Sequence, residues 1–205
     1  MNQVSTSDKT PKTARGKRTQ EKLLQAAEIE FGEKGYHAAA ISSITYRAGV
    51  ALGTFYTYFE SKEEIFKALV SFMSQRTRRW IAERVADAPD RMTAERKGLE
   101  AYIEFARAHK GIYRIISEAE FVANDAYRAH YTGFAKAYQY NLKKAAELGD
   151  IREGEYEIWS WAIMGIALAL GIRYAEWDET VPVSVIADSV SDLIENGMKR
   201  IQGPG

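Results

Sequence analysis

The chain has 205 residues, of which 46% are hydrophobic and 27% are charged, a composition typical of a folded protein with a substantial core. The absence of cysteine excludes disulfides, thiolate metal sites and cysteine nucleophiles. The 28 basic and 28 acidic side chains cancel, but residues 1–80 carry 13 basic and 8 acidic groups (net +5), against 15 and 20 (net −5) in residues 81–205. A neutral total therefore hides a basic N-terminal part.

The helical spacing of apolar residues predicts an all-α fold of about nine helices, since the chain shows no sustained period-two alternation. Gly35 is the expected end of the first helix, and Ser61-Lys-Glu-Glu64 is a capping box that opens the fourth. The expected helices cover about residues 17–33, 41–48, 52–59, 61–88, 93–109, 112–122, 124–147, 155–177 and 182–201.

Residues 1–16 precede the first expected helix and are predicted to be a disordered basic arm. The basic residues in or beside it are Lys9, Lys12, Arg15, Lys17 and Arg18. Such an arm is either a solvated tail or, beside a DNA-binding motif, a group of cations that neutralises phosphates or enters the minor groove.

The longest apolar run extends from Ile158 to Ile172 and is broken only by Ser160. Its fifteen positions are fewer than the roughly 18–20 that span a bilayer. The first eighteen residues are polar and basic, unlike a signal peptide. We therefore expect a buried helix in a soluble, cytoplasmic protein without a membrane partner.

Two short helices joined by a glycine are predicted between Ile41 and Phe59. Ile41, Ile44 and Ala48 form one apolar stripe at helical spacing, and Gly49 permits a tight turn into the next helix. This arrangement is a helix-turn-helix, in which the second helix enters the major groove of DNA.

The second of these helices carries aromatic residues on every side. Phe55 and Phe59, four positions apart, are expected to face the core, which leaves Tyr56 and Tyr58 pointing elsewhere. One interpretation places both tyrosines at the edge of the core, with their hydroxyls in water. The other has them contact phosphates and base edges, together with Thr54 and Lys62.

The stretch from about Arg18 to Val70 resembles the DNA-binding domain of the TetR family of bacterial transcription regulators. The resemblance rests on Ala27-x-x-x-Phe31, Gly35, Ile41-x-x-Ile44, Ala48-Gly49-Val50 and Gly53-x-x-Tyr56-x-Tyr58-Phe59-x-Ser61-Lys62-Glu63. It implies a helix-turn-helix DNA-binding domain at residues 17–62 and a helical ligand-binding and dimerisation domain at residues 63–205. It also implies a ligand-responsive regulator, typically a repressor, that binds a pseudo-palindromic operator as a homodimer and is released by a small apolar or acyl-type effector.

By position, the resemblance implies DNA contacts from six residues of the first domain: Ser42, Gly53, Thr54, Tyr56, Tyr58 and Lys62. Ala40 and Ala51 depart from the threonine and serine that usually cap the second and third helices of the family. A lost N-cap costs about 1 kcal/mol of helix stability.

The C-terminal part is dense in aromatic residues, which either fill the core or line an effector pocket together with a few polar groups. The candidates for effector contacts are Tyr102, Phe105, Tyr113, Phe121, Tyr127, Tyr131, Trp159 and Arg173. The stretch from Tyr113 to Phe121 weakly resembles TetR members that respond to acyl-coenzyme A or fatty acyl ligands.

Small residues lie on adjacent rows of the apolar helix near the C-terminus, where they permit the close approach of another helix. In the TetR family the last two helices form a four-helix bundle across a dimer interface, whereas a helix buried within one subunit is the other interpretation. The expected interface residues are Gly165, Ile166, Ala169, Leu170, Val190, Leu193 and Ile194.

The chain shows no catalytic motif: the Gly-x-Ser-x-Gly, P-loop, His-Glu-x-x-His and Gly-x-Gly-x-x-Gly patterns are missing. We therefore expect no enzyme and no cofactor. A helical protein–protein adaptor with a vestigial helix-turn-helix, and more distantly a helical enzyme, remain as alternatives, and a gel-shift with the DNA upstream of its own gene separates the regulator from the adaptor.

Overall fold

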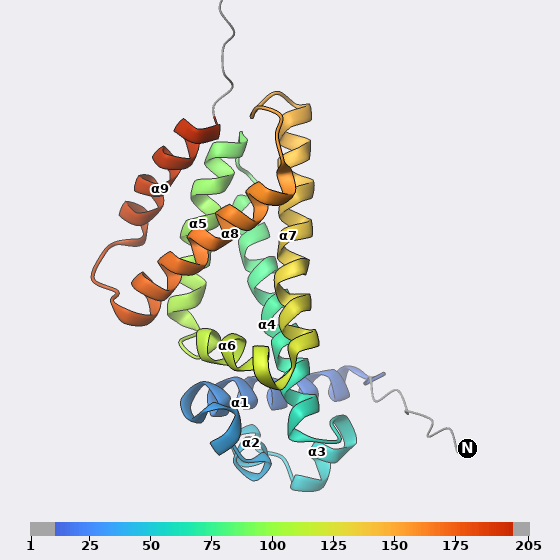
Figure 1. Ribbon diagram of the computed structural model, residues 1–205. Coiled ribbons are helices and arrows are strands. Elements are labelled where there is room, and N and C mark those ends of the chain that lie inside the picture. Colours follow the sequence, from blue (N-terminus) through green and yellow to red (C-terminus); the bar gives the residue numbers. More distant parts are fainter. Residues whose placement is uncertain (1–10, 199–205) are drawn as a thin grey trace, which may run out of the picture. The chain divides into compact units, whose positions relative to one another are not determined.

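The computed structural model describes residues 11–198, and the side chains of residues 11–195. Within this range the chain forms nine α-helices and one π-helical segment without a strand, which confirms the predicted all-α fold (Figure 1). The helices are α1 (Ala14–Ala38), α2 (Ile41–Ala48), α3 (Leu52–Tyr58), α4 (Lys62–Val85), α5 (Arg91–Ala108), α6 (Ile112–Val122), α7 (Asn124–Glu147), α8 (Tyr156–Gly171), the π-helical η1 (Ile172–Trp177) and α9 (Val183–Met198).

The described chain forms two compact units. The first, here called the head, comprises residues 11–72 and 114–127, and the second comprises residues 73–113 and 128–198. The sequence predicts a boundary after residue 62, whereas the head also includes the first part of α4 and most of α6.

The first helix begins earlier than the sequence predicts. The Thr13 side chain caps α1, because its Oγ1 accepts a hydrogen bond from the Gly16 N–H at 3.0 Å. Residues 14–16 of the predicted arm are therefore helical, while residues 1–10, including Lys9, lie outside the described residues.

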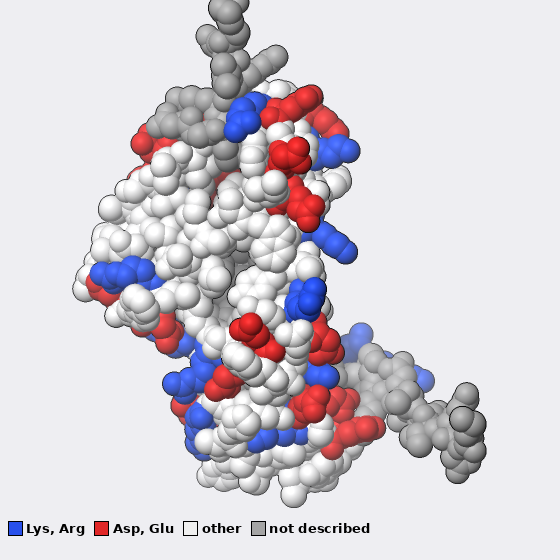
Figure 2. Space-filling view, viewed as in Figure 1, with Lys and Arg blue, Asp and Glu red and all other residues white. Residues whose placement is uncertain are grey.

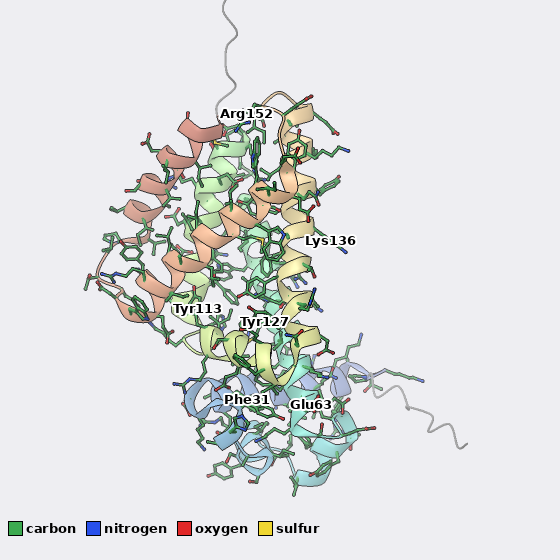
Figure 3. The ribbon with its side chains drawn as sticks, viewed as in Figure 1. Phe31, Glu63, Tyr113, Tyr127, Lys136 and Arg152 are labelled. Atoms are coloured by element: carbon green, nitrogen blue, oxygen red, sulfur yellow. The ribbon has the colours of Figure 1, made fainter. Side chains whose placement is uncertain are left out.

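The core of the head is built from the apolar faces of its first four helices. Phe31 of α1, labelled in Figure 3, lies in this core. Its ring packs edge-on against Phe66 of α4, with ring centroids 5.0 Å apart, and stacks on Tyr36 with centroids 5.9 Å apart. The fully buried large side chains of this core are Leu23, Phe31, Ile44, Phe55, Ile65, Phe66 and Leu69.

A break near the end of α1 exposes backbone polar groups that two charged side chains satisfy. Gly35 has φ 77° and ψ 167°, a conformation that is essentially confined to glycine. The Tyr36 N–H donates to the Glu118 carboxylate at 2.6 Å. The Lys62 ammonium donates to the carbonyls of Tyr36, His37 and Ala39 at 2.8, 3.1 and 3.0 Å.

In the second unit α5 packs against α8, η1 and α9 (Figure 1). A buried cluster of Leu142, Ala145, Ile151 and Ile194 joins α7, the turn after it and α9. Arg107, near the end of α5, supports the segment around η1, because it donates to the carbonyls of Tyr174 and Val181 at 3.0 and 2.8 Å.

The apolar helix near the C-terminus forms as expected, but the prediction that it is buried is wrong within one chain. Together α8 and η1 make a continuous 22-residue segment, and only 17% of its most apolar stretch is buried. Ile158 and Trp161 are 64% and 44% exposed. The segment is apolar on several sides and its own chain covers only part of them; by length and composition alone it is also sufficient to cross a bilayer.

We predict that Gly35→Ala destabilises the protein by about 1–3 kcal/mol, because an alanine is strained at this φ and ψ. Its Cβ would also lie only 2.6 Å from the Glu118 Oε1. Chemical denaturation followed by circular dichroism measures the change. Gly53→Ala is the matched control: a Cβ there meets no atom within 4 Å, so an equal loss of stability in both variants would contradict the account.

Candidate DNA interface and effector site

The turn between α2 and α3 has the geometry of a helix-turn-helix. Gly49 adopts the left-handed conformation with φ 66° and ψ 36°, and its N–H donates to the Tyr46 carbonyl at 3.1 Å. The Val50 N–H donates to the Thr45 carbonyl at 3.0 Å, which closes the turn. The glycine predicted to permit this turn is therefore the residue that makes it.

The third helix has a buried aromatic face and an exposed face. Phe55 and Phe59 are 0% and 2% exposed, with ring centroids 5.7 Å apart. The exposed face consists of Leu52, Gly53, Tyr56 and Thr57, and the half-buried Thr54 and Tyr58 lie at its edges. The predicted contact residues of α3 thus lie on or beside its exposed face.

Two of the exposed side chains of α2 are Ser42, which the sequence predicts as a DNA contact, and Tyr46, which it does not. Ser42 is exposed at the start of α2, and Tyr46, 87% exposed, follows it by four positions on the same face. This spacing of four positions was the feature of the sequence that could have placed Tyr46 beside Ser42. Ala40 and Ala51 precede α2 and α3 without a side-chain cap, so the first N–H groups of both helices receive no bond from the N-cap side chain.

A buried carboxylate ties α1 to α2 beneath this surface. Glu30, whose side chain is 1% exposed, accepts from Lys34 at 2.7 Å and from Arg47 at 3.4 Å, and Arg47 also binds Glu33 at 2.6 Å. Burial raises the pKa of Glu30, but the hydrogen bonds and charge of Lys34, with Ser43 and Arg47, outweigh burial and lower the pKa overall. The ionised form of Glu30 therefore stabilises the head.

Lys62, predicted to bind phosphate, is engaged within the head. Its three carbonyl partners match the three donors of an ammonium group, and its Nζ lies 4.6 Å from the centroid of the Tyr36 ring. Its position at the first residue of α4 is as the resemblance implies. Its contacts make it a cap for the end of α1.

Two tyrosines predicted as effector contacts meet in the second unit. The Tyr113 hydroxyl donates to the Tyr102 hydroxyl at 3.1 Å, and burial raises the pKa of both groups. Gly171, at the end of α8, leaves room for this pair, because a Cβ there would collide with the Tyr113 hydroxyl.

A second polar pair lies in the same unit. The Ser74 hydroxyl and His130 Nδ1 are 2.6 Å apart, and the His130 ring packs edge-on against Tyr131 with centroids 4.9 Å apart. Burial, with the charge of Arg78, lowers the pKa of His130 to about 4, so the imidazole is neutral at pH 7. No spacing pattern indicates this pair, because its members are 56 residues apart in the chain.

The other predicted effector residues also have contacts outside the tyrosine pair. Phe105 stacks on His109 with centroids 4.2 Å apart, and Tyr131 stacks on Trp161. Trp159 lies against Tyr156 and Arg152, while Arg173 pairs with Asp178 at 3.1 Å. Phe121 is 86% exposed, and both Phe121 and Tyr127 belong to the head.

The predicted dimer residues fall into two groups. Gly165, Ala169 and Leu193 are exposed, while Ile166, Leu170 and Val190 are half-buried. Ile194 is only 9% exposed and belongs to the core cluster of its own chain, so a partner could reach little of it.

Comparison with known proteins places these features in a family. Residues 23–69 match the bacterial regulatory proteins of the tetR family. The chain therefore carries a TetR-family DNA-binding domain. It is accordingly a DNA-binding transcriptional regulator, and the matched residues include all of α2 and α3.

Three relatives extend the comparison. The fatty acid metabolism regulator protein of Bacillus subtilis is 27% identical over 179 residues, which are 84% of this chain and 86% of that protein. The transcriptional activator FasR of Mycolicibacterium smegmatis is 31% identical over 100 residues, 49% of this chain and 46% of FasR. The structure of Bacillus subtilis FadR in complex with stearoyl-CoA shares the fold with a TM-score of 0.67 at 22% identity, covering 86% of this chain and 98% of that chain.

The charge of Glu30 predicts a dependence of stability on pH. Since the folded-state pKa is below the ordinary value of 4.5, the stabilisation is complete above that value and is lost as the pH falls through the folded-state pKa. Glu30→Gln should therefore cost about 2 kcal/mol at pH 7 and less below pH 4. Thermal unfolding of the parent and the variant at a series of pH values measures the difference in their stability. A stability difference that is the same at every pH would contradict the prediction.

Lys62→Met should destabilise the head by about 1–3 kcal/mol, because it leaves three carbonyls without their donor, and should leave the salt dependence of DNA binding unchanged. A phosphate contact predicts the reverse, a salt slope smaller by about 1 with unchanged stability. Denaturation and DNA titrations at several salt concentrations distinguish the two. Lys143→Met, at an exposed position of α7, is the control and should change neither quantity.

Proposed function

We propose that the protein is a repressor that binds a pseudo-palindromic operator as a homodimer and leaves it when a fatty acyl compound, such as an acyl-CoA, binds the second unit. The observation that carries DNA binding is the exposed outer face of α3, held over the buried Phe55 and Phe59 within the matched helix-turn-helix. The acyl class is suggested by the relative named for fatty acid metabolism and by the fold shared with the stearoyl-CoA complex.

The proposed DNA contacts are made by the surface of α2 and α3. Ser42 at the start of α2, and Gly53, Thr54, Tyr56 and Tyr58 of α3, supply hydroxyls and a close backbone approach. The N-terminal residues of a recognition helix contact base edges, and hydroxyls also bind phosphates. Lys62 supports this surface by fixing the end of α1, which precedes α2 directly.

The proposed dimer interface is the uncovered side of α8 with the adjoining part of α9. Gly165 and Ala169 let another helix approach closely, and Leu193, 66% exposed, adds apolar area. A two-fold dimer explains the bare apolar surface and places two recognition helices on one operator. In this assembly the segment is covered by protein, so we propose a cytoplasmic protein in contact with the chromosome and not with a membrane.

The proposed effector region is the aromatic interior of the second unit. The Tyr102–Tyr113 pair and the Ser74–His130 pair supply the few polar groups that orient a ligand among apolar side chains. The effector must bind the DNA-free conformation more tightly than the DNA-bound one, because a ligand with equal affinity for both shifts nothing. The relatives are named as regulators, and we propose no enzymatic activity.

Fluorescence anisotropy tests this function directly. The full-length protein is titrated onto a labelled duplex from the region upstream of its own gene, with a scrambled duplex of equal length as control. Preferential binding that stearoyl-CoA weakens, and free coenzyme A does not, is the expected result. Equal affinity for both duplexes would contradict the operator, and an unchanged affinity with stearoyl-CoA would contradict the effector class.

Gly165→Leu tests the interface sharply, because a Cβ at Gly165 meets no atom of its own chain within 4 Å. The Cβ of the larger side chain therefore enters open space on its own subunit, and a loss of assembly with unchanged circular dichroism points to the partner. Overpacking costs about 1–3 kcal/mol per site, and a two-fold axis doubles it. Sedimentation should show dissociation at micromolar concentration with unchanged circular dichroism, whereas Ala137→Leu, at an exposed position of α7, should remain dimeric.

A further inference from the structure

The recognition helix lacks the side chains that read bases by paired hydrogen bonds. Its sequence from Leu52 to Tyr58 is Leu-Gly-Thr-Phe-Tyr-Thr-Tyr, without arginine, lysine, asparagine, glutamine or a carboxylate. The strong base contacts in the major groove are bidentate bonds from arginine or lysine to guanine and from asparagine or glutamine to adenine, while carboxylates accept from cytosine. None of these pairings is open to α3.

The cations closest in sequence to α3 are held by the protein itself. Arg47 of α2 binds the carboxylates of Glu33 and Glu30 at 2.6 and 3.4 Å. Lys62 at the start of α4 donates to three carbonyls at the end of α1. Neither side chain is available to compensate for the missing guanine contact without giving up these bonds.

The large side chains exposed on and beside α3 are mainly apolar. Among the described residues of the head, the large hydrophobic side chains that are exposed are Ile29, Tyr46, Leu52, Tyr56 and Phe121. Three of the five lie within residues 46–56: Tyr46 is 87%, Leu52 50% and Tyr56 49% exposed. In Figure 2 the lowest edge of the head is uncharged, below a band of basic and acidic side chains. Exposed apolar groups concentrated on one surface mark a place of contact.

The major groove presents one apolar group, the C5-methyl of thymine. We propose that α3 selects its half-site through thymine methyl groups that pack against Leu52 and the ring of Tyr56, with hydroxyl hydrogen bonds in place of bidentate pairs. This inference rests on the proposed DNA binding and specifies the chemistry of the sequence that is bound. Leu52 and Tyr56 are four positions apart and share one face of α3, so they can contact neighbouring base pairs. Gly53 beside them adds no side chain that would hold the helix away from the groove.

Replacement of thymine by deoxyuridine tests the proposal, because it removes the methyl group and leaves every hydrogen-bonding group in place. The full-length protein first selects its preferred duplex from a random library. That duplex is then synthesised with deoxyuridine at each thymine in turn, and affinities are measured at constant salt. Burial of one methyl group corresponds to about a four-fold change in affinity. We expect losses of this size at one or more thymines in each half-site and none in the flanks.

The outcomes separate the inference from the function on which it rests. If no duplex is enriched, DNA recognition itself is contradicted. If a duplex is enriched but deoxyuridine changes nothing at any position, or if only 7-deazaguanine substitutions weaken binding, recognition stands and the thymine proposal is overturned.

Two variants assign the methyl contact to its side chain. Leu52→Ala should bind the parent duplex more weakly and should lose the deoxyuridine penalty at one thymine per half-site, since the partner of that methyl is gone. Leu148→Ala, at a 70% exposed position outside the head, should keep every penalty. If Leu52→Ala and Tyr56→Ala both retain the full set of penalties while circular dichroism is unchanged, the methyl groups contact other residues and the assignment to α3 is wrong.

Discussion

The break in α1 at Gly35 determines how the head is held together. A helix that stops being helical at one residue releases an N–H and several carbonyls, and buried groups of this kind are costly unless they are bonded. The Glu118 carboxylate accepts a hydrogen bond from the Tyr36 N–H, and the Lys62 ammonium donates to the carbonyls of residues 36, 37 and 39. One site thus joins the end of α1 to the start of α4 and to α6, and α6 belongs to the head through this bond and that of Arg114 to the Glu33 carbonyl at 2.7 Å.

The parts of the head that local sequence determines could be predicted. A glycine after an apolar stripe predicts the turn at Gly49, and two phenylalanines four apart predict the buried face of α3. The roles of Lys62 and Glu118 could not, because their partners lie 23–26 and 82 residues away. A lysine at the start of a helix is equally suited to a phosphate and to three carbonyls, and only the fold supplies the carbonyls.

In the second unit, local sequence predicts even less of which side chains meet. Aromatic residues are common to cores and pockets, so their number predicted an effector region without saying which of them would meet. Tyr102 and Tyr113 are brought together across the connection of α5 to α6, whereas Phe121 is exposed in the other unit. Helical spacing identifies a face, but packing between helices distant in sequence decides what that face touches.

In the proposed dimer, the bare side of α8 links the behaviour of the protein to its own abundance. A helix that is mostly uncovered in one copy would gain its burial from the proposed second copy, and the extent of dimer formation would then depend on the protomer concentration. Occupancy of a two-fold site by such a chain varies roughly as the square of the protomer concentration while dimers are scarce. A modest change in synthesis or degradation is then amplified at the DNA before any small molecule has bound.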